Sequence, residues 1–158
     1  MSKKTSVLFV CLGNICRSPI AEGVFRQLVE SEGLTGDFQI DSCGTGAWHE
    51  GERPHLESQR VAKKNDIDIS QQRARQLRDD DFVNFDYIIA MDQSNKADIN
   101  DSKIGERSSV YCLREFDSEG SSLDVPDPYY GGPSGFDNVF SMIDRSSKKL
   151  LQHILDQS

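Results

Sequence analysis

The chain of 158 residues lacks any apolar run that approaches the ~20 residues needed for a membrane-spanning helix. Its N-terminal apolar stretch leads straight into a predicted core strand and is too short for a signal sequence. We therefore expect a cytoplasmic protein that does not insert into a membrane. Internal repeats, low-complexity tracts and linkers are absent too. The length suits one hydrophobic core, so we expect a single domain over residues 1–158.

Basic residues are scarce, because 18 Lys and Arg stand against 26 Asp and Glu and leave a net charge of −8. This balance argues against nucleic acid as a partner. The three histidines (49, 55 and 153) have no metal-ligand spacing, so we expect no metal and no cofactor. The four cysteines form no dense disulfide framework. In a reducing compartment they are expected to be buried, reactive or regulatory, with Cys43 and Cys112 in the core.

What the sequence does contain is an alternation of apolar runs with helical periodicity, which is typical of βαβ units. The predicted strands are residues 6–11, the segment around Phe38 and Ile40, residues 87–91 and residues 110–113. The predicted helices are residues 18–32, 55–65 and 93–100 and a long closing helix from Phe136 to Leu155. We therefore predict an α/β fold, a doubly wound domain with a four-stranded parallel sheet flanked by helices on both faces. Such sheets bind ligands beyond the carboxyl ends of their strands.

The CLGNICRS loop, Cys11–Ser18, follows the first predicted strand and precedes Pro19 and a predicted helix. A tight loop at a helix N-terminus points several backbone N–H groups at one spot, and Gly13 and Asn14 tolerate the left-handed backbone of such a turn. With the donor fork of Arg17, that spot suits a tetrahedral oxyanion such as phosphate. Cys11 would lie beneath the anion as a thiolate nucleophile. A Cys-x5-Arg spacing alone also fits a structural cysteine and a surface arginine, but this context favours phosphoryl transfer through cysteine.

Two irregular segments are candidates for the walls of a pocket around this loop. Residues 118–135 form a long Gly-, Ser- and Pro-rich stretch with Asp127, Tyr129 and Tyr130. Asp127 is the candidate general acid, although Asp-Pro pairs also simply open turns. Residues 41–54 hold the only tryptophan, Trp48. The three aromatic residues could form a slot for a planar leaving group or could merely pack on the surface.

CLGNICRSPIAE together with DPYYG resembles the low-molecular-weight protein tyrosine phosphatases, and DSCGTGAWHEG, ARQL, FDYIIAMD and the closing helix extend the match over essentially the whole chain. The resemblance implies a phosphocysteine on Cys11 and Asp127 acting as acid and then as base. It also implies that Ser18 assists the thiolate, and that Asn14 and Ser42 brace the loop. The phosphate-binding residues that it implies are Arg17 and the backbone amides of Leu12, Gly13, Asn14, Ile15 and Cys16. The substrate slot that it implies is Trp48, Tyr129 and Tyr130.

The same resemblance implies tyrosine-phosphorylated proteins as partners, opposed by a tyrosine kinase system. Ile15 matches the tyrosine-type members, whereas related arginine phosphatases carry threonine there. The resemblance also suggests a reversible Cys11–Cys16 disulfide that protects the nucleophile. Two positions depart from the family: Gln72 replaces a histidine, so support for Asn14 would come from Gln72 or elsewhere, and His55 replaces a residue that is often acidic.

Two other functions share these features. An arsenate reductase would need further cysteines near the third strand, and residues 78–92 contain none. A phosphate-binding module without activity would not need both Cys11 and Asp127. The sequence leaves the physiological substrate and the oligomeric state open.

Overall fold

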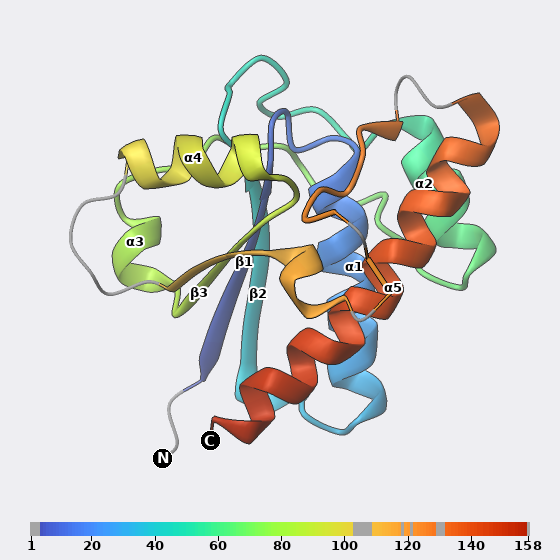
Figure 1. Ribbon diagram of the computed structural model, residues 1–158. Coiled ribbons are helices and arrows are strands. Elements are labelled where there is room, and N and C mark those ends of the chain that lie inside the picture. The colour runs from blue at the N-terminus through green and yellow to red at the C-terminus, as the bar shows by residue number, and fades with distance from the viewer. Residues whose placement is uncertain (1–3, 103–108, 118, 121, 129–131, 158) are drawn as a thin grey trace.

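The computed structural model describes residues 4–102, 109–117, 119–120, 122–128 and 132–157. At its centre is a four-stranded parallel sheet with the strand order β2-β1-β3-β4 (Figure 1). Its strands are β1 (Thr5–Cys11), β2 (Phe38–Gly44), β3 (Tyr87–Ala90) and β4 (Ser109–Cys112). The predicted doubly wound α/β fold is confirmed.

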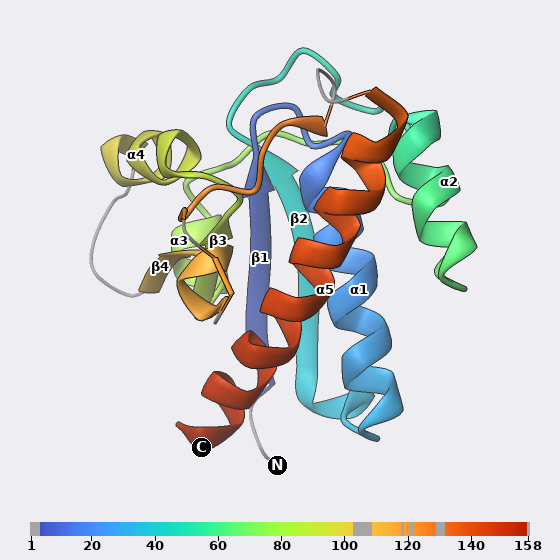
Figure 2. The ribbon, with the colours of Figure 1, turned by 45° about the vertical axis from the view of Figure 1, so that its right-hand side comes forward.

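Helices cover both faces of the sheet. One face carries α1 (Arg17–Ser31), α2 (Leu56–Lys64) and α5 (Gly132–Asp156), and the other carries α3 (Asp81–Asn84) and α4 (Gln93–Ser102) (Figure 2). Alternate residues of β1 divide between the two faces. Val7 and Phe9 pack with α1 and α5, whereas Leu8 and Val10 pack with Phe82 of α3 and its neighbours. This two-sided burial explains why β1 is apolar throughout.

Some boundaries differ from the sequence-based predictions. The short helix α3 was not predicted, and the 3-10 turns η1 (Thr35–Asp37) and η2 (Leu113–Phe116) were not predicted either. Leu113 was predicted in the last strand but begins η2, because the Glu115 carboxylate accepts the Cys112 N–H and turns the chain. The closing helix starts at Gly132, so the long irregular segment is shorter than predicted.

The loops after the strands gather at one end of the sheet, at the top of Figure 1. The CLGNICRS loop after β1 lies there beside the chain after β2 and the segment that leads into α5 (Figures 1 and 2). This is the end where parallel sheets bind ligands. Among the helices in the described ranges, none combines the length and apolarity required to cross a bilayer.

Candidate active site

The CLGNICRS loop is folded tightly against the end of β2. The backbone N–H groups of Thr45 and Gly46 donate to the carbonyls of Cys11 and Leu12, each at 2.9 Å. At Gly44 a Cβ atom would lie 2.7 Å from the Leu12 carbonyl oxygen and 3.1 Å from the Asn14 nitrogen. Only glycine permits this close approach. Asn14 itself has φ of 57°, the left-handed conformation predicted for this turn.

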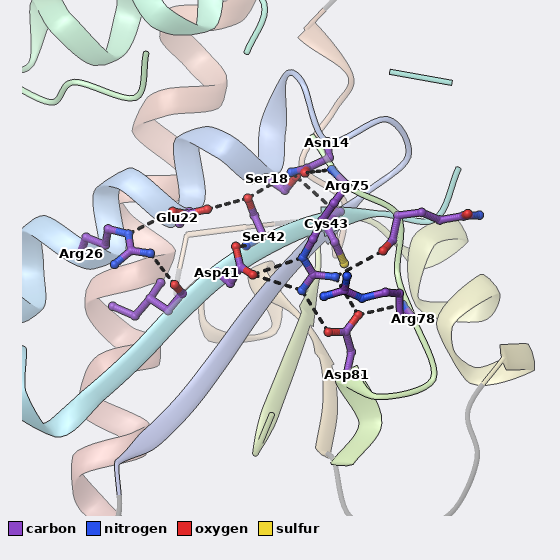
Figure 3. Close-up of polar contacts among 12 residues, drawn as sticks. Asn14, Ser18, Glu22, Arg26, Asp41, Ser42, Cys43, Arg75, Arg78 and Asp81 are labelled. Atoms are coloured by element: carbon purple, nitrogen blue, oxygen red, sulfur yellow. Dashed lines mark hydrogen bonds and ion pairs between the residues drawn. The ribbon is translucent and has the colours of Figure 1, made fainter. Parts of the chain in front are cut away.

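The buried side chain of Asn14 connects the loop to its surroundings (Figure 3). Its Nδ2 donates to Ser18 Oγ at 2.8 Å and to Ser42 Oγ at 3.0 Å, and Ser42 Oγ in turn donates to Glu22 at 2.7 Å. Its Oδ1 accepts the backbone N–H of Arg75 at 3.1 Å. Every hydrogen-bonding group of the Asn14 amide therefore has a partner, and the loop is held from inside the protein.

The sulfur of Cys11 lies at the floor of this arrangement. Ser18 Oγ is 3.0 Å from Sγ, and the Asn14 backbone N–H donates to Sγ at 3.3 Å. Because Ser18 Oγ already accepts from Asn14, its own hydrogen can point at the sulfur. The Asn14 N–H and the Ser18 hydroxyl therefore both contact the sulfur.

A cavity of about 270 Å³ opens above Cys11. It brings together residues that are far apart in the sequence. Its lining residues are Cys11, Leu12, Gly13, Ile15, Cys16, Arg17, Trp48, His49 and Asp127. The predicted nucleophile, anion-binding arginine and acid therefore share one cavity.

Arg17 is fixed at one end of its guanidinium. Its Nη1 donates to the Asp92 carboxylate at 2.7 Å and to the Val125 carbonyl at 2.9 Å. Burial works against the charge, but the neighbouring Cys11 sulfur and the Asp92 carboxylate outweigh it and raise the pKa of Arg17 above its ordinary value. Within the described ranges, Nε and Nη2 have no hydrogen-bond partner, so that edge can bind an anion in the cavity.

Asp127 reaches the cavity from the acid segment, which we define as residues 117–128. Asp127 is exposed to solvent while also lining the cavity. Val125 anchors the segment, because its N–H donates to the Met91 carbonyl at 2.8 Å and its own carbonyl accepts from Arg17. At the other end the buried Asp117 carboxylate binds Arg145 at 2.7 Å and Arg114 at 3.2 Å. Asp127 is therefore held at the cavity by the backbone of its segment and by distant ion pairs.

Trp48 forms an outer wall of the cavity and is 71% exposed. A Cβ atom on Gly46 would collide with the indole ring, so the missing side chain at Gly46 leaves room for that ring. The predicted partners of Trp48 in the aromatic slot, Tyr129 and Tyr130, lie outside the described residues. His49, which the sequence analysis did not assign to the site, lines the cavity and has Nδ1 2.9 Å from a Glu52 carboxylate oxygen.

Cys16 also lines the cavity, and both Cys11 and Cys16 are free thiols. Burial raises the pKa of the Cys16 thiol to about 12, and the neighbouring Cys11 and Asp127 add to the rise. Cys16 is therefore protonated at neutral pH. The Cys11–Cys16 disulfide stays a prediction.

Gln72 does not take the predicted supporting position. Its Nε2 donates to the Pro19 carbonyl at 3.1 Å, whereas Asn14 is supported by Ser18, Ser42 and the backbone of Arg75. Gln72 thus contacts the first turn of α1 instead of the loop. His55 caps α2 by accepting the Glu57 N–H at 3.1 Å. This second departure from the family is therefore a helix cap.

Sequence reasoning missed Asp92, Gly44 and Arg75. Asp92 had a usable signal, since it follows β3 at the end of the sheet where ligands bind. Gly44 and Arg75 act through backbone contacts, which cannot be predicted from the types of the residues.

Comparison with known proteins gives a consistent result. The family model described as "Low molecular weight phosphotyrosine protein phosphatase" matches residues 6–158. A protein of that description from Schizosaccharomyces pombe is 51% identical over 156 residues, which is 98% of this chain and 99% of the relative. A protein tyrosine phosphatase structure from Entamoeba histolytica has a TM-score of 0.93 at 34% identity and covers 98% of this chain and 99% of that one. A Drosophila arginine phosphatase has a TM-score of 0.88 at 31% identity, covering 94% and 96%.

Proposed function

Because this chain belongs to the low molecular weight phosphotyrosine protein phosphatase family and is a protein-tyrosine phosphatase, we propose that it hydrolyses phosphotyrosine in proteins, and small aryl phosphates, through a phosphocysteine on Cys11. The observation that carries this proposal is the position of Cys11 Sγ, which lies 3.0 Å from Ser18 Oγ and accepts the Asn14 N–H at 3.3 Å, in a cavity shared with Arg17 and Asp127.

In the first step, the Cys11 thiolate attacks phosphorus in line with the leaving oxygen. The S–P bond forms while the bond from phosphorus to the tyrosine oxygen breaks. Asp127 gives its proton to that oxygen, so tyrosine leaves as a neutral phenol. The free edge of Arg17 and the backbone amides of Leu12, Gly13, Asn14, Ile15 and Cys16 stabilise the charge on the equatorial oxygens.

In the second step, water attacks the phosphocysteine. The Asp127 carboxylate accepts a proton from the water, the S–P bond breaks, and the thiolate and inorganic phosphate are regenerated. The sum is phosphotyrosine plus water giving tyrosine plus phosphate. Side chains, backbone amides and water carry both steps without a cofactor or a metal.

The walls of the cavity support an aryl phosphate as substrate. Leu12, Ile15 and Trp48 are apolar side chains above a polar floor, which suits a planar ring that carries a phosphate. We propose that Tyr129 and Tyr130 complete this slot. The partners would be tyrosine-phosphorylated proteins in the cytoplasm, supplied by an opposing tyrosine kinase system, and residues 1–158 would act as one domain.

We also propose that Cys11 and Cys16 form a reversible disulfide under oxidation. Both thiols line the same cavity. Mass spectrometry after mild peroxide treatment would detect the bond as a loss of two hydrogens between the two cysteines. A Cys16→Ser variant should then lose activity irreversibly under the same treatment.

The proposed intermediate can be trapped directly. Rapid acid quench of an Asp127→Ala variant during turnover of an aryl phosphate should yield one phosphoryl group on Cys11 by mass spectrometry. A Cys11→Ser variant should show neither the adduct nor turnover, while still binding inorganic phosphate. Turnover by Cys11→Ser, or a complete lack of adduct when release is slowed, would refute the mechanism.

A matched pair of peptides tests the substrate class. A phosphotyrosine peptide should be hydrolysed at least tenfold faster than the same peptide with phosphoarginine. The Ile15→Thr variant introduces the residue of the arginine-type relatives and should narrow this difference. A preference of the wild-type enzyme for phosphoarginine would contradict the proposed substrate.

A further inference from the structure

Arg75 touches the CLGNICRS loop, although the proposed chemistry does not use it. Its backbone N–H donates to Asn14 Oδ1 at 3.1 Å, and its carbonyl accepts the Gly44 N–H at 2.8 Å. The other end of the Asn14 amide donates to Ser18 and Ser42. Since an amide oxygen cannot donate, the N–H of Arg75 determines which way the Asn14 amide lies.

The side chain of Arg75 is clamped between two carboxylates from different elements (Figure 3). Asp41 of β2 accepts from Nε at 3.2 Å and from Nη2 at 3.1 Å. Asp81 of α3 accepts from Nη1 at 3.0 Å and from Nη2 at 2.9 Å. The Asp81 carboxylate is only 2% exposed and also accepts the Arg78 N–H at 2.8 Å, so it is a fixed point.

Only a planar guanidinium can make both of these contacts at once. A lysine has three donors on one atom and would satisfy one carboxylate while leaving the other short of donors. The clamp therefore fixes the Arg75 residue between β2 and α3. The Arg75 carbonyl also accepts the Gly44 N–H, so the backbone of Arg75 is held as well as its side chain. In this position the Arg75 N–H donates to Asn14 Oδ1.

We propose that Arg75 is a positioning residue for phosphate binding, whose clamped side chain holds its backbone N–H on Asn14 and so keeps the CLGNICRS loop in its anion-binding shape. This inference rests on the proposed function, because it assigns phosphate to that loop. Among the described residues, those that line the Cys11 cavity do not include Arg75. Arg75 therefore acts through Asn14.

Binding of inorganic phosphate tests the proposal without requiring turnover. The only tryptophan, Trp48, lines the Cys11 cavity, so its fluorescence reports occupancy. Arg75→Met should weaken phosphate binding about tenfold, which is the size of one hydrogen bond. Arg75→Lys should recover part of this loss. The value of kcat/KM for an aryl phosphate should fall by the same factor.

A matched control separates positioning from general stability. Ile88 is buried in β3 and belongs to the same core cluster as Phe82 of α3. Ile88→Ala should lower the thermal midpoint yet leave phosphate affinity within twofold of wild type. If Arg75→Met lowers the thermal midpoint and binds phosphate as tightly as wild type, Arg75 is only structural and the proposal is wrong.

A second variant keeps the test decisive if Arg75→Met does not fold. The Asp41 side chain is 44% exposed, so Asp41→Ala should fold and remove one side of the clamp while leaving the buried Asp81 pair. Phosphate should bind about threefold more weakly, in line with a partial loss of one hydrogen bond. Wild-type affinity in this variant would overturn the proposal. Phosphate binding without hydrolysis by the wild-type protein would instead overturn the proposed function.

Discussion

The CLGNICRS loop and the acid segment meet over one cavity, but they are held in different ways. The loop is braced by short, uncharged hydrogen bonds next to the Cys11 sulfur, from Asn14 to Ser18 and Ser42. The acid segment is anchored by ion pairs at Asp117, ten residues before Asp127 in the chain. An additional carboxylate beside Cys11 would repel a bound phosphate. The Asp117 carboxylate lies at the remote end of the segment and does not.

The exposure of Cys11 and Asp127 follows the same division. Cys11 is buried, so the hydrogen bonds at its sulfur act in a lower dielectric than water. Asp127 is exposed, so the water that attacks in the proposed second step can reach its carboxylate. Side-chain hydrogen bonds therefore hold the loop around Cys11, whereas backbone contacts and ion pairs hold the segment that carries Asp127.

The largest expected effect comes from Arg17, which joins the two regions by binding Val125. Arg17→Lys should lower kcat/KM for an aryl phosphate about 10³-fold, because all the donors of lysine lie on one atom and cannot span from Asp92 and Val125 to the phosphate. Steady-state kinetics would measure this, with circular dichroism as a check of folding. A loss of less than tenfold would show that the guanidinium fork is dispensable.

Asp127→Asn should act on the acid segment alone. It should lower kcat about 10²-fold for phenyl phosphate and much less for nitrophenyl phosphate, whose leaving group needs no proton. Affinity for inorganic phosphate should not decrease, since the loop is untouched. Equal losses for leaving groups of different basicity would remove Asp127 as the acid.

Asp117→Asn tests the remote anchor. Hydrogen bonding from Arg145 holds the pKa of Asp117 well below its usual range, despite burial of the carboxylate. The charged form therefore stabilises the fold above about pH 4, and this contribution is lost as the pH falls toward the lowered pKa.

At pH 7 the Asp117→Asn variant should lose about 3 kcal/mol of unfolding free energy. The gap from wild type should narrow as the pH is lowered from 5 toward 2. Urea titrations at several pH values measure it. A gap that does not change with pH would show that the ion pairs at Asp117 contribute no net charge stabilisation.

The smallest effect is expected at a position that serves neither region. Ser147 is fully buried in α5, and its hydroxyl has no hydrogen-bond partner among the residues that the structure describes. Ser147→Ala removes a buried polar group and improves helix propensity, so it should stabilise the protein by up to about 1 kcal/mol. Activity should not change. A clear loss of stability would imply a buried partner for this hydroxyl.

The fold could be predicted because its strands are uniformly apolar and its helices are amphipathic. Residues 87–91 could be assigned to a strand since burial on both faces leaves few polar positions. The four-residue helix α3 carries too short a pattern to detect. Leu113 suits a strand or a turn equally, and the Glu115 side chain decides between them.

The candidate site could be predicted where chemistry demands a residue type. Cys11 and Arg17 are six positions apart between a predicted strand and a predicted helix, and this arrangement indicates a phosphate-binding loop. Asp127 lies in a segment that is too long for a simple connection. Support for Asn14 was left open between Gln72 and another source, and the structure shows the other source, because the direction of the Gln72 amide depends on tertiary packing. The contribution of Arg75 reaches Asn14 through a backbone N–H, which is the same for nearly every amino acid.

The guanidinium of Arg17 is held at Nη1 by Asp92 and Val125 before any substrate is present. An arginine that moved freely would lose about 2 kcal/mol of rotamer entropy on gripping an anion. Here that ordering is already complete when the protein folds. Each catalytic cycle therefore begins with the arginine preorganised, so that affinity for the dianion is diminished little by conformational restriction.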